Sequence, residues 1–291
     1  FTGKINDMAL NTDGTRLYLT APVTELYGPT LYGPTRYFAW TARGRVEGYV
    51  LVLNVDEADR PQPTSSNPLP VNPRKWHEFI AHLPGGVEPY GIKGTSDPDK
   101  MIFTSRLRGA LDPATGEPTY KGLQTIQVTN GDPNGFSADV KSIALDKLTP
   151  TPSFREQLNV KNPADVAIMP DMSYAFVSDW YVPQSVTSSS LVSYEETHNT
   201  GAKITIIENP FGPSPKQLAS TTPIPMGFAN EIALSSDGKK LYVNYKGAGD
   251  VVVFDVQNLL ARTKVVPQVP NQKTFDPRTG LRTVEVLDRL P

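Results

Sequence analysis

Hydrophobic and polar positions along the chain follow a pattern that recurs four times. Each copy opens with a short run of apolar and small residues, passes through a turn rich in Asp, Pro and Gly, and ends in a second run centred on an aromatic residue. Period-two alternation with β-branched and aromatic residues predicts strands, and the turns predict tight hairpins between them. The four predicted hairpins span residues 6–20, 88–105, 164–178 and 230–244, and their turns centre on Asp13-Gly14, Pro98-Asp99, Pro170-Asp171 and Asp237-Gly238.

Two more strand candidates follow every hairpin. The expected third strands are residues 48–55, 123–129, 202–208 and 250–256, and the expected fourth strands are 76–83, 154–160, 216–222 and 282–288. Four strands in succession predict a meander sheet, so we expect four units at about residues 5–84, 85–161, 162–223 and 224–291. A compact propeller blade needs only about 40–45 residues, and the excess is expected to form insertions between strands.

Radial repetition of four-stranded antiparallel sheets is the β-propeller architecture, which is known with about four to eight blades. The expected fold class is therefore all-β, with residues 1–291 forming one propeller region. Four blades can close a small ring. The pattern starts just before an inner strand and stops just after an outer one, which favours four blades of a larger, seven- or eight-bladed ring completed by sequence outside these residues.

The amino-acid composition excludes several kinds of functional site. The 291 residues include no Cys, which excludes a thiol nucleophile, a disulfide framework, a zinc–thiolate site and an iron–sulfur cluster. Lys and Arg total 28 against 30 Asp and Glu, and a net charge of -2 argues against a dedicated nucleic-acid binder. The chain contains no apolar run of roughly 18 residues or more, so we expect no direct membrane insertion.

The hairpins resemble the YVTN-type β-propeller repeat, whose pattern is close to A-hydrophobic-S-P-D-G-x-x-L-Y-V-T-N followed by V-x-V-hydrophobic-D. Residues 230–256 match best, through Tyr242-Val243-Asn244 and Val253-Phe254-Asp255, and residues 88–105 match least well. The resemblance implies a bacterial or archaeal surface, periplasmic or secreted propeller, often one module beside flanking domains of the same polypeptide. Related propellers include lactonases and amine dehydrogenase subunits, so the resemblance implies a fold and not a reaction.

The connections between second and third strands are the expected recognition sites. They are long at residues 22–47, 107–122 and 181–201, short at 246–249, and in a meander they open on the face where the inner strand starts. The first holds a duplicated Leu-Tyr-Gly-Pro-Thr, and aromatic and Arg side chains dominate interface energetics. They either pack on an adjacent blade or bind a protein or glycan partner; the candidates are Tyr27, Tyr32, Arg36, Tyr37, Phe38, Trp40, Trp180 and Tyr181.

Acidic residues recur at the start of the predicted inner strands. Asp7, Asp165 and Glu231 align with one another and with Pro89, and Glu88 lies one residue away. Two roles are open. Their oxygens could hold Ca²⁺ at the mouth of a central channel, or each carboxylate could accept backbone N–H groups of a neighbouring blade as a latch. The turn aspartates are weaker ligand candidates, because turn chemistry already explains them.

Candidates for catalysis are few. The three histidines are His77 and His82 on a predicted outer strand and His198 in the third insertion, where it could act as a base. We assign no catalytic residue. The sequence favours a non-catalytic interaction or structural module of an exported or cell-surface protein. The alternative is a propeller enzyme of lactonase or dehydrogenase-subunit type that uses a divalent cation at the channel mouth.

Overall fold

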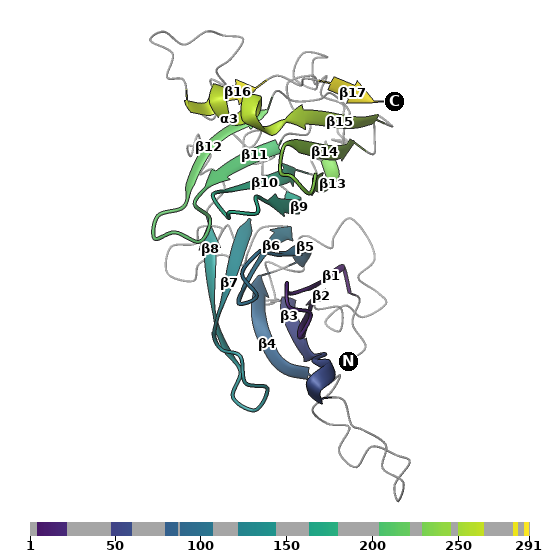
Figure 1. Cartoon of the computed structure of the whole chain (residues 1–291), viewed down its shortest axis with the longest axis vertical. Coiled ribbons are helices and arrows are strands. Elements are labelled where there is room, and N and C mark those ends of the chain that lie inside the picture. The colour runs from purple at the N-terminus through teal and green to yellow at the C-terminus, as the bar shows by residue number, and fades with distance from the viewer. Residues whose placement is uncertain are drawn as a thin grey trace, which may run out of the picture. The chain divides into compact units, whose positions relative to one another are not determined.

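The computed structural model consists mainly of β-strands (Figure 1). It describes residues 5–21, 48–59, 79–86, 88–106, 122–143, 163–179, 204–221, 229–245, 250–264, 282–284 and 288–290. The chain divides into two compact units, Phe1–Ser142 (unit 1) and Ile143–Pro291 (unit 2). Each unit contains two sheets, and each is described by itself below.

Unit 1 contains two four-stranded meanders, in which strands adjacent in sequence are adjacent in the sheet. Blade 1 consists of β1 (Asp7–Leu10), β2 (Arg16–Ala21), β3 (Gly48–Asn54) and β4 (Phe79–Gly86). Blade 2 consists of β5 (Glu88–Gly94), β6 (Lys100–Arg106), β7 (Leu123–Asn130) and β8 (Ser137–Ile143). A 3₁₀ turn, η2 (Glu57–Asp59), follows β3.

Unit 2 also contains two four-stranded meanders, and one extra strand joins the outer edge of the first of them. Blade 3 consists of β9 (Pro163–Ile168), β10 (Tyr174–Asp179), β11 (Ile204–Glu208) and β12 (Lys216–Thr221), and β16 (Arg282–Val284) adds to β12 in parallel. Blade 4 consists of β13 (Ala229–Leu234), β14 (Lys240–Tyr245), β15 (Asp250–Asp255) and β17 (Asp288–Leu290). The four antiparallel meanders confirm the predicted all-β propeller class.

The four hairpins and the four third strands lie where the sequence predicts them, but two fourth strands were predicted wrongly. In blade 2 the fourth strand is β8, not residues 154–160, which lie outside the described residues. A tight turn directly after β7 causes this: Asn130 Nδ2 donates to the Gly135 carbonyl at 2.8 Å, and its Oδ1 accepts the Asp132 N–H at 3.1 Å. The Gly-Asp-Pro-Asn-Gly stretch at 131–135 was the missed signal.

The outer part of blade 4 also differs from the expectation of one strand over 282–288. Residues 282–284 pair with blade 3, and Asp288–Leu290 pairs with β15. Directly after β15 lies an unpredicted helix, α3 (Val256–Lys264), which begins where Asp255 Oδ1 accepts the Asn258 N–H at 2.9 Å as an N-cap. In blade 1 the fourth strand is shifted toward the C-terminus, since β4 spans Phe79–Gly86 and not 76–83.

The hydrophobic core of each unit lies between its two blades. In unit 1, Tyr18 and Val52 of blade 1 pack with Met101 and Phe103 of blade 2. In unit 2 the same layer is formed by residues of blade 3 and blade 4, among them Phe176, Ile206, Leu241, Val243 and Phe254. We call the face of a blade that packs on the next blade in sequence its forward face, and the opposite face its backward face.

Backbone approach between blades 1 and 2 depends on one glycine of β5. A Cβ placed on Gly94 would lie 2.7 Å from the carbonyl oxygen of Leu10 in β1. The nearest atom belongs to the backbone, so a side chain there would force the two inner strands apart. Glycine at this position therefore sets the spacing of the junction.

We expect Gly94→Ala to lower the free energy of unfolding of unit 1 by about 1–3 kcal/mol, because the added methyl overpacks a backbone contact. Hydrogen exchange of unit 1 peptides in the full chain measures this. The control is Gly135→Ala, where the added Cβ would meet only the Asn130 side-chain nitrogen, at 3.1 Å. Equal losses of protection in both variants would contradict the close-approach argument.

Candidate functional site

A carboxylate and a hydroxyl at one end of blade 1 bind the backbone of blade 2. Asp7 Oδ2 accepts the Ile92 N–H at 3.0 Å, and Asp7 Oδ1 accepts the N–H of Met8 in its own strand at 2.9 Å. Thr20, paired with Asp7 in the sheet, donates to the Tyr90 carbonyl at 2.6 Å. The N–H and C=O of β5 that flank Gly91 are thus both satisfied by blade 1.

The same arrangement recurs in unit 2. Asp165 Oδ2 accepts the Ile232 N–H at 3.2 Å, and Ser178 Oγ donates to the Asn230 carbonyl at 3.2 Å. The hydroxyl residue follows the acid by 13 positions in both units. We call this set of contacts the latch, and its hydrogen bonds confirm the latch hypothesis for Asp7 and Asp165.

The spacing of 13 residues corrects the alignment of blade 2. There the pair is Gly91 and Thr104, whose Oγ1 accepts the Gly91 N–H at 3.0 Å. The alignment with Pro89 and Glu88 was therefore wrong, because the pairing of β5 with β6 is irregular between Pro89 and Ile92. Blade 2 has glycine where blades 1 and 3 carry the carboxylate.

In blade 4 the latch position is held by Glu231, which is exposed at the start of β13. Asn244, 13 residues later in β14, is exposed as well. Sequence analysis identified the acids of this set but missed the hydroxyl residues Thr20 and Ser178. A Ser or Thr at a fixed spacing after each of these two acids could have identified them.

The cation hypothesis for Asp7, Asp165 and Glu231 stays a prediction. Asp7 belongs to unit 1 and the other two residues to unit 2. Both oxygens of Asp7 accept backbone N–H groups, and Lys93 Nζ lies 3.7 Å from its Oδ2. Within the part of the chain that the structure describes, no three Asp, Glu or His side chains are grouped so that they could hold a metal ion.

The long connections leave the blades at the latch end. Asp7 pairs with Thr20, and Thr20 with Val50, so residues 22–47 join β2 and β3 at this end of blade 1. Residues 180–203 join β10 and β11 in the corresponding place in blade 3. The predicted binding residues all lie outside the described residues and stay predictions; they are Tyr27, Tyr32, Arg36, Tyr37, Phe38, Trp40, Trp180 and Tyr181.

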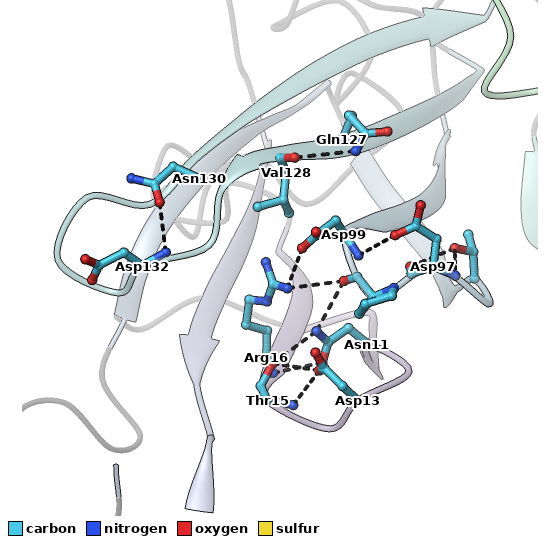
Figure 2. A network of polar contacts seen from close by, with 12 residues as sticks. Asn11, Asp13, Thr15, Arg16, Asp97, Asp99, Gln127, Val128, Asn130 and Asp132 are labelled. Atoms are coloured by element: carbon cyan, nitrogen blue, oxygen red, sulfur yellow. Dashed lines mark hydrogen bonds and ion pairs between the residues drawn. The ribbon is translucent and has the colours of Figure 1, made fainter. Parts of the chain in front are cut away.

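The opposite end of the unit 1 junction is held by a buried arginine (Figure 2). Arg16 Nη2 donates to Asp99 Oδ1 at 2.6 Å and to the Pro98 carbonyl at 3.4 Å. Asn11 accepts the Arg16 N–H at 2.9 Å through Oδ1 and donates to the Pro98 carbonyl at 3.2 Å. The hairpin turn of blade 1 is thereby tied to the turn of blade 2, and sequence reasoning missed this contact.

Turn chemistry explains three of the four turn aspartates. Asp13 and Asp171 each accept the N–H and the hydroxyl of the residue two positions later, and Asp237 accepts the Lys239 N–H at 3.1 Å and the Ser235 hydroxyl at 2.7 Å. The hydrogen bond from Ser173 lowers the pKa of Asp171. In blade 2, Asp97 takes the turn role by accepting the Asp99 N–H at 3.0 Å, which leaves Asp99 to bind Arg16.

The described histidine, His82, is exposed on β4. Its ring lies beside those of Tyr49 and Phe79, with centroid separations of 6.1 and 6.2 Å. This agrees with the expected solvated outer-strand position. His77 and His198 lie outside the described residues, so the role of His198 as a base stays a prediction.

The chain is similar to several solved structures at low sequence identity. No family model and no curated protein matches the chain. The similarity to the YVTN repeat therefore rests on its motifs alone. The periplasmic gluconolactonase of Pseudomonas aeruginosa is 14% identical over 85% of this chain and 52% of its own, with a TM-score of 0.48. A putative 6-phosphogluconolactonase of Bacteroides uniformis is 12% identical over 97% and 53% of the two chains, with a TM-score of 0.48.

Hydrazine synthase of Kuenenia stuttgartiensis is 17% identical over 99% of this chain and 74% of its own, with a TM-score of 0.44. The chain spans about half the length of the two lactonase-type structures.

Among the described residues, no helix has the length and apolar character needed to cross a membrane.

We expect Asp165→Ala to lower the free energy of unfolding by about 1–3 kcal/mol, because the buried Ile232 N–H loses its acceptor. Glu231→Ala is the matched control at the same blade position and should change stability by less than about 0.5 kcal/mol. Urea denaturation measures both. A rise in Tm on adding Ca²⁺ that Asp165→Ala abolishes would contradict the latch and favour the cation hypothesis.

A second prediction concerns pH. Burial raises the pKa of Tyr18 from 10.0 to about 12, against the opposing charge of nearby Arg16. Within the described residues, the buried hydroxyl meets no partner at full hydrogen-bond geometry. Below pH 10 the phenol is neutral in both states; above it the unfolded chain releases the proton first, so the fold loses stability as pH rises toward 12.

Replacing Tyr18 by Phe should therefore change stability little at pH 7 and remove about 2 kcal/mol of the loss between pH 10 and 12. Chemical denaturation across this pH range measures the difference from wild type. Tyr242→Phe, at an exposed tyrosine, is the control and should leave the pH profile unchanged. If the free energy of unfolding of Tyr18→Phe falls with pH as steeply as that of wild type, a group other than Tyr18 causes the loss of stability above pH 10.

Proposed function

We propose that the protein is a non-catalytic propeller module that binds a protein or glycan partner through the long connections at the latch end of its blades. The observation that supports this most is the strand register, which puts the ends of β2 and β3 and of β10 and β11 beside the latch residues. Long connections anchored on a rigid sheet are the usual location of binding residues.

The binding surface in this proposal is built mainly by residues 22–47. The stretch from Tyr27 to Trp40 combines aromatic rings with Arg36, a composition enriched in binding surfaces. Tyr and Trp supply large contact areas with few rotatable bonds, so they lose little conformational entropy on binding. We further propose that the module belongs to an exported or cell-surface protein, as its repeat motifs suggest.

The alternative function, a lactonase- or dehydrogenase-type propeller with a divalent cation, depends on carboxylates that are available to a metal. The hydrogen bonds of Asp7 and Asp165 to backbone N–H groups favour a structural role for both residues. Of the three acids, Glu231 is the exposed one. A single carboxylate is a poor set of ligands for Ca²⁺, which takes six to eight oxygens. We therefore favour binding over catalysis.

The test uses the full chain with Tyr27, Tyr32 and Tyr37 replaced by Ala. A glycan array probes glycan binding, and a photoreactive residue at position 32 captures a protein partner in cells. We expect the triple variant to lose binding more than tenfold, because aromatic anchors typically contribute 2 kcal/mol or more each. The control replaces Arg74, Trp76 and His77 in another connection. Binding that persists in the triple tyrosine variant but is lost in the control variant would contradict the proposal.

A further inference from the structure

The turn between β7 and β8 contains two Asn-Gly steps, at residues 130–131 and 134–135. In an Asn-Gly step the peptide nitrogen of the glycine can attack the side-chain amide of the asparagine, because glycine has no Cβ to hinder the approach. The attack joins two groups of one chain in a five-membered ring, so it needs no enzyme. Both steps are therefore candidates for spontaneous deamidation.

Hydrogen bonds of the glycine N–H separate these two steps. The chain contains four steps in which Asn or Asp precedes Gly, and in three of them the glycine N–H donates to a backbone carbonyl at 2.8–3.0 Å. These bonds run from Gly14 to Asn11, from Gly135 to Asp132 and from Gly238 to Ser235. Among the hydrogen bonds of the described residues, the Gly131 N–H donates none. A bonded N–H must first lose its acceptor, so the Gly131 nitrogen is the freest of the four to react.

The side chain of Asn130 is also the better electrophile (Figure 2). Its Oδ1 accepts the Asp132 N–H at 3.1 Å, which polarises the amide and puts a donor where negative charge develops during the attack. The Asn134 side chain instead donates, from its Nδ2 to Asp132 Oδ1 at 3.2 Å. Asp13 and Asp237, which precede the other two glycines, are carboxylates at neutral pH and resist a nucleophile.

Water reaches the reacting groups directly, since Asn130 and Gly131 are both exposed. Hydroxide and water are the two reagents that the reaction takes from solvent. The fold therefore leaves the first of the two Asn-Gly steps open to reagents and to the attacking nitrogen at once.

We propose that Asn130 is a site of spontaneous deamidation, and that its product opens the turn between β7 and β8. Hydroxide removes the amide proton of Gly131, and the nitrogen forms a bond to Asn130 Cγ. The Cγ–Nδ2 bond breaks, and Nδ2 leaves as ammonia with a proton from water. Water then adds to one of the two carbonyls of the succinimide ring, which opens to aspartate or to isoaspartate at position 130.

Both products lose a contact that closes the turn. Asn130 Nδ2 donates to the Gly135 carbonyl at 2.8 Å, and a carboxylate has no proton to donate. Isoaspartate also lengthens the main chain directly before Gly131, where even a Cβ would lie 3.3 Å from Arg16 Nη1. Arg16 lies on the forward face of blade 1 and joins the two blades through Asp99. The modification therefore loosens blade 2 beside this contact.

The first experiment compares the two Asn-Gly steps within one chain. The full chain is incubated at mildly alkaline pH, and tandem mass spectrometry of its peptides follows the amide-to-acid mass change at positions 130 and 134. We expect Asn130 to convert about fivefold faster than Asn134 or more, since one hydrogen bond typically contributes a factor of this size. In urea, where both asparagines simply precede a glycine, the two rates should be similar.

Variants assign the reaction to its residue. Asn130→Gln should remove most of the conversion in the native chain, whereas Asn134→Gln should leave the rate at position 130 unchanged. Equal rates at the two positions of the native chain, faster conversion at Asn134, or no conversion at Asn130 while the chain in urea reacts overturns the proposal.

Hydrogen exchange of the full chain tests the effect on the turn. Asn130→Asp supplies the aspartate product directly, and its amides at 131–143 should exchange about fivefold faster than those of wild type, because the turn loses a hydrogen bond. Asn134→Asp adds the same charge to the same turn and is the matched control, with a smaller change expected. Exchange in Asn130→Asp that equals wild type, or that the control reproduces, overturns the opening of the turn.

Discussion

The structure depends on the backbone of the innermost strand of each blade. β1, β5, β9 and β13 are edge strands of their sheets, so one side of each has N–H and C=O groups that no strand of its own sheet can pair. Such groups are costly when they are buried without partners. At both described junctions the preceding blade supplies the missing partners, as Asp7 does for Ile92 and Asp165 for Ile232. Core packing and latch therefore form together.

The two units secure the opposite ends of their junctions differently. In unit 1 the buried Arg16 joins the hairpin turns through Asp99 and the Pro98 carbonyl (Figure 2). In unit 2 the turn of blade 4 lies beside Met169 and Pro170 of blade 3, since a Cβ placed on Gly238 would lie 3.3 Å from Met169 Cε and 3.4 Å from Pro170 Cδ. A charged contact and an apolar one thus serve the same structural purpose, while the hydrogen-bonded end is the same in both units.

The sequence predicted what local patterns determine. Alternation and turn residues are contained within each hairpin, so all four hairpins could be located. The fourth strands depend on pairing between distant segments, and β16 and β17 show that neighbouring parts of one segment can join different sheets. The acids at 7 and 165 stood out as repeated charges. Arg16 did not, because its partner Asp99 lies 83 residues away and only the packed blades bring them together.

The hydrogen bonds of the latch go to backbone atoms of the receiving strand, and in unit 1 the Lys93 side chain adds an ion pair, with its Nζ 3.7 Å from Asp7 Oδ2. A carboxylate and a hydroxyl that recognise an N–H and a C=O place no demand on the identity of residues 90–92 or 230–232. A duplicated blade can therefore accumulate substitutions in its receiving strand and still be held by the blade before it. This tolerance is consistent with the unlike inner strands of blades 2 and 4, Glu88–Gly94 and Ala229–Leu234.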